Sequence, residues 1–440
     1  MIGSIVFAVL LIGASLLFAV KVRQMRANMA MGRDVDRSDN RSERWKVMAR
    51  VAMGQSKMGK RPVAAFLHLL IYVGFVLINI EVLEIVIDGV TGEHRVFSGL
   101  GPVYDGLIAS FEVLAFLVLL ACVVFLIRRN VMKIKRFHYK EMLGWPKNDA
   151  NIILVVEILL MTALLTMNAA DSILQSRGEA HYPEAGAFPI SGLLVPLFEG
   201  MSTDALIGLE RGMWWFHIIG IFAFLNYLPY SKHFHIIMAF PNTWHSNLKP
   251  KGQFNNMESV TNEVKMMFDP EADPYAAPPP AEEGAQPQRF GAKDVTDLTW
   301  KNLMDAYTCT ECGRCSSACP ANQTGKLLSP RKIMMDTRDR MEELGKARRK
   351  NGADHDDGKA LLGDYITEEE LWACTSCNAC VEECPVNIHP LHIIMEMRRY
   401  LVMEESKSPT ELNGMFTNIE NNGAPWQFSP QDRLNWANED

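Results

Sequence analysis

The sequence lacks an excess of basic charge. Its 44 Lys and Arg residues against 51 Asp and Glu residues give a formal net charge of −7 over 440 residues. Basic residues are concentrated only in residues 21–61 and 128–147, which flank hydrophobic segments. Proteins that bind nucleic acid usually present a concentrated basic face. The composition therefore argues against a nucleic-acid partner.

Long hydrophobic runs are missing from residues 241–440 and are confined to residues 1–240. The 48% hydrophobic content of the whole chain therefore averages two unlike halves. A chain of this length is expected to form two or more domains. We expect an apolar domain in the first half and a more polar globular domain in the second.

Cysteine is almost absent outside two short runs. One of the nine cysteines, Cys122, lies in an apolar segment, where a free cysteine usually behaves as a small buried hydrophobic residue. The other eight form two copies of the pattern Cys-x2-Cys-x2-Cys-x3-Cys-Pro, and no cysteine follows the second copy. The runs are Cys309, Cys312, Cys315 and Cys319 with Pro320, then Cys374, Cys377, Cys380 and Cys384 with Pro385.

This pattern is typical of a protein that binds two 4Fe–4S clusters, because each cubane has four iron corners and each corner needs one thiolate. In two-cluster ferredoxins the fourth cysteine of each run ligates the other cluster. We therefore predict the ligand sets Cys309, Cys312, Cys315 with Cys384, and Cys374, Cys377, Cys380 with Cys319. Zinc sites do not require two three-plus-one runs followed by proline. Disulfides suit small proteins of oxidising compartments, which this chain does not resemble.

Helix signals surround the two cysteine runs. Ser329 and Pro330 are typical of a helix start. Residues 367–370 form a capping box, and residues 392–404 are predicted to form a further helix. The two runs also lie farther apart than in a compact βαβ ferredoxin. We therefore predict an all-α dicluster domain over residues 294–405.

Five stretches of the first half are long and apolar enough to cross a bilayer. They are residues 2–20, 62–87, 107–127, 151–170 and 213–240, the last with Pro229 as a candidate kink. The sequence therefore predicts an all-α fold, with a five-helix transmembrane haem-binding bundle followed by the dicluster domain.

Loop charges predict the orientation of these spans. The basic segments alternate with residues 88–106 and 171–212, which hold only three basic residues, Arg95, Arg177 and Arg211. By the positive-inside rule the N-terminus lies outside, and the basic loops lie in the cytoplasm. An odd number of spans also places the cysteine domain in the cytoplasm. The sequence predicts a multi-pass protein of the inner membrane of a prokaryote.

Two further segments complete the predicted organisation. Residues 269–288 are rich in Pro and Ala, which is typical of an extended, semi-rigid linker. We predict a membrane domain over residues 1–240, a linker over 241–293 and a tail over 406–440. The tail has three large aromatic residues, Trp426, Phe428 and Trp436, but no catalytic pattern. We expect it to pack on a partner, with disorder as the alternative.

Histidine is scarce in the predicted spans, where ionisable groups are costly and usually functional. His68 lies near the cytoplasmic end of the second span and His235 near that of the fifth. Axial imidazoles from two helices are a common way to hold haem b. We therefore predict His68 and His235 as the haem ligands, with His233 as the close competitor.

The role of His217, nearer the outer face, stays open among three interpretations. It ligates a second haem with His94 or His181 as a partner, borders a quinone site, or is a hydrogen-bonded interior histidine. Similar alternatives apply to four carboxyl groups in or at the ends of spans, namely Glu81, Glu84, Glu112 and Glu157. Each is either a proton-relay group near a quinone or a residue satisfied by water. The second interpretation is favoured for any one of them, with Glu84 the leading exception.

The first half resembles the gamma (cytochrome b) subunit of respiratory nitrate reductase, which has five spans with haem ligands on the second and fifth. The resemblance lies in three segments, Phe66-Leu-His68-Leu-Leu, Trp214-Trp-Phe-His217 and Leu228-Pro-Tyr-Ser-Lys-His233-Phe-His235-Ile. The second half resembles the dicluster subunits of heterodisulfide reductase and anaerobic glycerol-3-phosphate dehydrogenase, through its two cysteine runs. The whole chain is similar to membrane-bound iron–sulfur oxidoreductases that fuse these two modules.

These resemblances imply an electron-transfer subunit that connects a cytoplasmic redox partner to menaquinone or ubiquinone, in either direction. The implied partner is an iron–sulfur subunit with Cys-Cys-Gly domains, an electron-transfer flavoprotein or a dehydrogenase subunit. The alternative is a redox-sensing or structural iron–sulfur membrane anchor without haem-linked electron flux. A catalytic subunit of the heterodisulfide type is disfavoured, because the Cys-Cys-Gly cysteines are missing.

Overall fold

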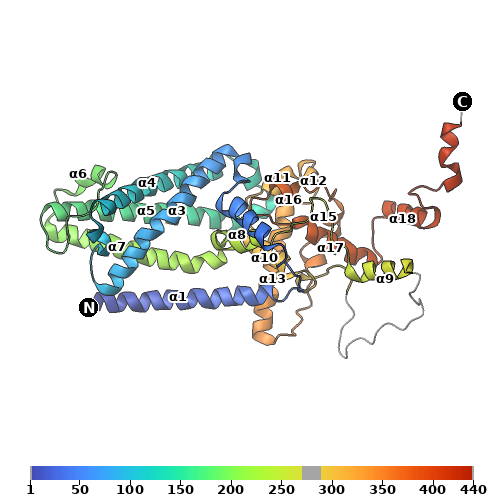
Figure 1. Ribbon diagram of the computed structural model, residues 1–440, viewed down its shortest axis with the longest axis horizontal. Coiled ribbons are helices and arrows are strands. Elements are labelled where there is room, and N and C mark those ends of the chain that lie inside the picture. The colour runs from blue at the N-terminus through green and yellow to red at the C-terminus, as the bar shows by residue number, and fades with distance from the viewer. Residues whose placement is uncertain (1, 270–288, 439–440) are drawn as a thin grey trace.

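The computed structural model describes residues 2–269 and 289–438. It is built of helices, and the described residues contain only two isolated β-bridges. A long helical bundle carries a compact helical domain at one end, and the C-terminal segment projects away from both (Figure 1). The N-terminus lies at the opposite end of the bundle from the cysteine domain (Figure 1).

Five long helices form the bundle. They are α1 (Ile2–Met29), α3 (Pro62–Thr91), α4 (Pro102–Asn130), α5 (Trp145–Ser176) and α7 (Thr203–Tyr227). Proline occupies the first turn of α3, α4 and α5, where its missing N–H has no helical partner in any case. Phe7, Ile108 and Trp214 are among the buried residues of the bundle core.

Four of these helices, α1, α3, α4 and α5, are long and apolar enough to cross a membrane. Large apolar side chains such as Ile12, Phe66 and Leu120 are exposed on their outer surfaces. Apolar side chains on the outside of a helical bundle are suited to lipid, where the helices satisfy their own backbone polar groups. The helices therefore indicate association with a membrane.

The fifth predicted span differs from the structure. A single helix was expected over residues 213–240, but α7 ends at Tyr227. Two 3-10 turns follow, Leu228–Tyr230 and Lys232–Phe234, and then α8 (His235–Trp244) begins. Pro229 supplies no backbone N–H for a continuous helix, which explains the interruption. His233 and His235 therefore lie beyond the end of α7.

The cysteine domain is helical, as predicted. Its principal helices are α10 (Trp300–Thr308), α11 (Arg314–Ala318), α13 (Pro330–Asn351), α15 (Glu368–Trp372), α16 (Ala379–Glu383) and α17 (Pro390–Met403). The Ser329 hydroxyl accepts from the Lys332 N–H at the start of α13, and the capping box of Thr367 and Glu370 is present at α15. These two helix starts and the helix after the second cysteine run are confirmed.

Shorter elements lie within the loops of the bundle, between the helices of the cysteine domain and in the tail. They are α2 (Arg41–Met48), the π-helix Ala49–Met53, α6 (Val195–Phe198), α9 (Glu258–Phe268), α12 (Pro320–Gln323), α14 (Leu361–Asp364) and α18 (Thr410–Asn422). Further 3-10 turns are Met58–Lys60, Val96–Leu100, Lys135–Phe137, Lys140–Met142, Ser191–Leu193, Val295–Asp297 and Pro430–Ala437.

The segment predicted as a linker is only partly a spacer. The Asn242 amide donates to the Val386 carbonyl at 3.0 Å and accepts from the Lys301 amine at 2.9 Å. The start of the segment therefore packs on the cysteine domain. The Pro-rich core of the predicted linker lies largely outside the described residues. In the tail, α18 buries no residue, and Trp426, Phe428 and Trp436 are exposed.

Candidate metal centres

The first cysteine run forms a loop between α10 and α11. Cys309, Cys312 and Cys315 line a cavity together with two cysteines of the second run, Cys384 and Cys380. Glu311 and Gly313, on either side of Cys312, have positive φ angles of 53° and 71°. These left-handed positions curl the loop tightly, as they must to turn successive sulfurs toward one centre.

The second run repeats the same local conformation before α16. Ser376 and Asn378 flank Cys377 with φ angles of 56° and 60°. Burial, together with the neighbouring sulfurs of Cys374, Cys319 and Cys377, raises the pKa of the Cys380 thiol to about 12. The structure therefore brings Cys319 from the first run to the second loop and Cys384 to the first loop. This is the crossed arrangement that the spacing predicts, and ligation by these sets stays a prediction.

The donor chemistry of both groups fits iron–sulfur clusters. All nine cysteines are free, and Cys122 is fully buried in the bundle, as predicted. In the described part of the chain, no group of three or more His, Cys, Asp or Glu lies close enough to hold a single metal ion. A zinc site needs every sulfur about 2.3 Å from one ion. A cubane spreads its four thiolates over four separate irons, and the eight cysteines of the two runs supply enough thiolates for two such clusters.

Burial also affects the chemistry of the cysteine side chains. It raises the pKa of the Cys309 thiol to about 12, and the sulfurs of Cys312 and Cys384 add to the effect. Only the thiolate form ligates metal, and a bound cation deprotonates a thiol outright. A metal centre bound here would therefore supply the positive charge that a buried Cys309 thiolate needs.

The two loops differ in what surrounds them. The first faces the bundle: the Lys57 amine donates to the Cys384 carbonyl at 3.3 Å, and Arg331 donates to the Arg136 carbonyl at 2.7 Å. A Cβ atom on Gly313 would lie 2.4 Å from the Arg331 guanidinium, so this close approach requires glycine. In the second loop the Cys377 side chain is exposed.

His68 in α3 and His235 at the start of α8 form a facing pair. Their ring centroids are 6.3 Å apart and their planes are inclined by 45°. His68 Nδ1 lies 3.1 Å from the Gln55 side-chain oxygen, and His235 Nδ1 lies 3.0 Å from the Lys232 carbonyl oxygen. Both second nitrogens are therefore left for another partner. Hydrogen bonds of this kind orient histidines that bind metals.

This geometry fits one iron between the two imidazoles. With metal–nitrogen bonds of about 2.0 Å, one metal ion held by both imidazoles would suit ring centres about 6 Å apart. His235 is the first residue of α8, after the two 3-10 turns that follow α7. His233 lies 5.6 Å from His235 between ring centroids, but it also contacts the Phe224 ring at 5.4 Å. The His68–His235 pair therefore has the more suitable arrangement.

His217 is buried and isolated from other imidazoles. Its Nδ1 lies 3.0 Å from the Leu160 carbonyl oxygen, and among the described residues no other histidine ring is in contact with it. His94 and His181 contact each other instead, with centroids 5.4 Å apart. Both nitrogens of His94 are engaged, by Asp171 and by Arg211. A second histidine-ligated haem at His217 thus has no ready partner ligand.

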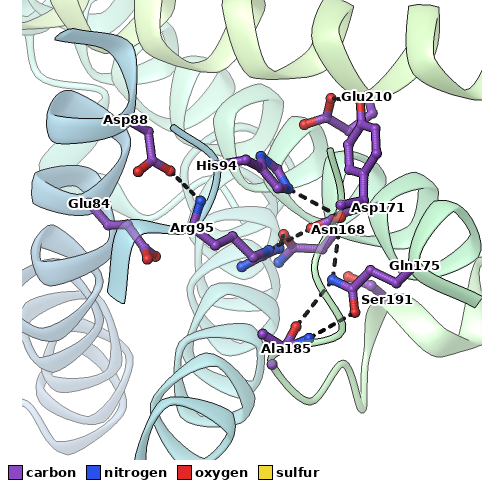
Figure 2. A network of polar contacts seen from close by, with 12 residues as sticks. Glu84, Asp88, His94, Arg95, Asn168, Asp171, Gln175, Ala185, Ser191 and Glu210 are labelled. Atoms are coloured by element: carbon purple, nitrogen blue, oxygen red, sulfur yellow. Dashed lines mark hydrogen bonds and ion pairs between the residues drawn. The ribbon is translucent and has the colours of Figure 1, made fainter. Parts of the chain in front are cut away.

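A buried polar network occupies the end of the bundle far from the cysteine domain (Figure 2). Arg95 is its centre, and its guanidinium donates to Asp171 at 2.6 Å, Asn168 at 3.0 Å and Tyr104 at 3.1 Å. Tyr104 in turn donates to Glu84 at 2.9 Å. From the sequence, Arg95 was only one of three basic residues in the outer loops. Its place at the centre of the network could not be predicted, because its partners lie on α4 and α5.

Three of the four carboxyl groups that the sequence singled out, Glu81, Glu84 and Glu112, differ in their hydrogen bonding. Glu112 accepts from the Ile190 and Ser191 N–H groups and from the Asn168 amide. Glu84 accepts from Tyr104 and the Phe97 N–H, whereas one carboxyl oxygen of Glu81 is buried without a partner. Protein groups thus satisfy Glu84 and Glu112 in place of the water that the sequence suggested.

Comparison with known proteins supports the cysteine chemistry. Residues 305–388 match the family model of a 4Fe–4S dicluster domain. That range contains all eight cysteines of the two runs. The chain therefore carries an iron–sulfur domain on a bundle of membrane-compatible helices. No solved structure matches the chain.

The chain is similar to several proteins that are named as oxidoreductases or as subunits of a reductase. A probable iron–sulfur-binding oxidoreductase, FadF, of Bacillus subtilis is 28% identical, over 99% of this chain and 61% of its own length. An EtfAB:quinone oxidoreductase of Syntrophomonas wolfei is 26% identical, over 99% of this chain and 59% of its own. One subunit of a CoB-CoM heterodisulfide reductase of Methanosarcina acetivorans is 36% identical, over 26% of this chain and 56% of its own.

These relatives match the predicted resemblance in part. The chain spans about three-fifths of the length of the first two. The similarity to a heterodisulfide reductase subunit supports the resemblance predicted for the second half. The resemblance of the first half to the nitrate reductase gamma subunit stays a prediction.

Proposed function

We propose that the chain is a membrane-anchored electron-transfer subunit that connects a cytoplasmic redox partner to the quinone pool. The observation that carries the proposal is the His68–His235 pair, with 6.3 Å between ring centroids, beside the buried first cysteine loop. A redox-sensing or structural anchor would not need two facing imidazoles in this place. When bound, two 4Fe–4S clusters and a b-type haem supply reversible one-electron transfer.

The surroundings of the cysteines suggest the order of the centres. Cys377 in the second loop is exposed, which suits exchange of electrons with a docked partner. Each set has two buried cysteines, Cys309 and Cys384 in the first and Cys319 and Cys380 in the second, and the loop of the first set lies against the bundle. We infer from exposed Cys377 that the second set exchanges electrons with the partner and the first set with the His68–His235 pair.

The residues of the histidine pair have defined roles in this proposal. Gln55 and the Lys232 carbonyl hold the two imidazoles by their Nδ1 atoms, which leaves Nε2 of each ring as the nitrogen that would bind iron. His233 is the alternative ligand, and His217 with the Arg95 network is the candidate border of a quinone site. The proposed path between the redox partner and the quinone pool carries electrons in either direction.

The proposed partner is a soluble redox protein. An iron–sulfur subunit with Cys-Cys-Gly domains, an electron-transfer flavoprotein or a dehydrogenase subunit would each dock beside Cys377. The name of the Syntrophomonas wolfei relative includes both EtfAB and a quinone, which supports this choice. The proposed location is the inner membrane, with the N-terminus outside and the cysteine domain in the cytoplasm.

A reduced-minus-oxidised optical spectrum of purified membranes tests the proposal. We expect a b-type band in the wild-type chain that is lost in His68→Ala, because one axial ligand is removed. The control is His138→Ala, which removes an exposed histidine of the same half and should leave the band unchanged. Iron–sulfur absorption without a b-type band in the wild-type membranes would contradict the electron path and favour the sensor.

A further inference from the structure

A buried ion pair joins the first cysteine loop to the histidine pair. Lys232 lies on the turn just before His235, and its amine pairs with the carboxylate of Glu311. Glu311 stands between Cys309 and Cys312 in the first loop. Only 9% of the Lys232 side chain and 3% of the Glu311 side chain are exposed. The two charges are thus shielded from solvent, and salt screens them little.

Each partner of this pair is tied to one proposed redox centre. The carbonyl oxygen of Lys232 lies 3.0 Å from Nδ1 of His235, so this residue also orients the proposed haem ligand. The backbone of Glu311 is part of the curl that carries Cys309 and Cys312, with a φ angle of 53°. The ion pair therefore joins the loop of one proposed centre directly to the turn that precedes a proposed ligand of the other.

Other charges around the pair hold its two members in place. The Arg338 guanidinium donates to Glu311 Oε1 at 2.7 Å. Asp149 of α5 accepts from the Lys232 N–H at 3.1 Å, and its carboxylate lies 3.8 Å from the Lys232 amine. Buried ion pairs contribute little net stability compared with apolar residues of similar volume. Stability alone is therefore a poor explanation for charges at this position.

We propose that Lys232 and Glu311 set the midpoint potentials of the two adjoining centres together, and fix their separation. The inference rests on the proposed function, because it requires a cluster at the first loop and haem at the histidine pair. A nearby positive charge stabilises the reduced form of a redox centre, which carries more negative charge, and a nearby negative charge destabilises it. As a pair, Lys232 and Glu311 largely offset each other at both centres.

Removing one charge at a time gives shifts of opposite sign. In Lys232→Met the Glu311 carboxylate is left without its lysine, so we expect both midpoint potentials to fall. In Glu311→Gln the lysine is left without its carboxylate, so we expect both potentials to rise. The double variant should return both potentials toward the wild-type values. A residue that acts only by packing has no reason to produce this pattern.

The measurement is a redox titration of the full-length protein in membranes, followed by optical spectra for haem and electron paramagnetic resonance for the clusters. Lys232→Arg keeps the charge and should keep the wild-type potentials. Lys251→Met is the matched control, because Lys251 also pairs with a glutamate of a cysteine run, Glu382, but its side chain is 79% exposed. Water and salt screen that pair, so the potentials at the first loop and at the histidines should not move.

The experiment distinguishes failure of the proposed function from failure of this inference. Wild-type protein without haem or acid-labile sulfide would overturn the proposed function itself. Variants that keep their iron and haem content but show unshifted potentials, or shifts of the same sign, would overturn this inference alone. If Lys232→Met loses haem because His235 is displaced, the sign of the shift in Glu311→Gln, which alters no contact of His235, decides the question.

Discussion

At the scale of single residues, Arg95 shows how a charged side chain is stabilised inside the apolar bundle. Arg95 is 5% exposed and has hydrogen-bond partners on α4 and α5 (Figure 2). Its charge offsets the buried carboxylate of Asp171. A charge in such a place is tolerated because it is paired and hydrogen-bonded, whereas an unpaired buried charge is expensive.

Replacement of Arg95 by methionine should destabilise the bundle. Arg95→Met removes the partner of Asp171 and leaves a buried carboxylate with only weaker contacts, which costs about 3–5 kcal/mol. Thermal unfolding of the detergent-solubilised protein measures the loss. Arg177→Met is the control, because Arg177 is exposed at the same end of the bundle. Equal melting temperatures for Arg95→Met and wild type would show that the network contributes little to the fold.

At the scale of elements, close helix approaches connect the bundle to the cysteine domain. The end of α1 crosses α13, where the Asn28 amide donates to the Tyr307 hydroxyl at 2.8 Å and its oxygen accepts from Arg349 at 2.6 Å. A Cβ atom added to Gly345 of α13 would lie 2.1 Å from the Asn28 oxygen. Glycine in the middle of a helix is costly, so its presence is explained by this crossing.

A methyl group at this crossing should therefore weaken the contact of α1 with α13. Gly345→Ala is expected to lower the free energy of unfolding by about 1–3 kcal/mol, because Asn28 must move out of its hydrogen bonds. Gly414→Ala provides the comparison in α18, where no atom lies within 4 Å of the added Cβ. There alanine should be neutral or stabilise the helix by up to about 1 kcal/mol. Denaturant unfolding followed by circular dichroism would reveal whether both variants behave alike.

At the scale of the whole molecule, buried polar contacts join a loop of the bundle to the cysteine domain. Arg331 of α13 is fully buried and donates to Glu141 at 2.8 Å, and Ser329 donates to the same carboxylate at 2.6 Å. Burial by itself would raise the pKa of Glu141, but Ser329 and Arg331 bring that pKa below its usual value. The ionised form of Glu141 therefore favours docking of the two halves.

This docking should weaken in acid. A carboxylate whose folded-state pKa is depressed contributes stability above its unfolded pKa, about 4.3 for glutamate, and loses it as the pH falls through the folded value. We expect Glu141→Gln to be less stable than wild type at pH 7 and the difference to shrink below about pH 4.3. Thermal unfolding of both proteins across this pH range tests the sign. A difference independent of pH would exclude a contribution from ionisation.

Much of the cysteine domain could be predicted because its signals are local. The spacing of Cys309 to Cys319 and of Cys374 to Cys384 selects the chemistry, since a cubane fixes which residues along a short loop can reach it. The cap at Ser329 and the box at Thr367 act within a single helical turn. Burial of Cys122 followed from its apolar neighbours.

Contacts between distant segments could not be predicted from such local signals. The sequence by itself determined the iron–sulfur pattern, the apolar helices and the candidate histidines. Only the tertiary structure placed His235 opposite His68, because the two residues lie on different helices, α8 and α3, whose packing brings their rings together. It also paired Lys232 with Glu311 and Arg95 with Asp171. Such pairs form only when helices that are far apart in the sequence pack together. The sequence positions of the two residues do not show that they will be in contact.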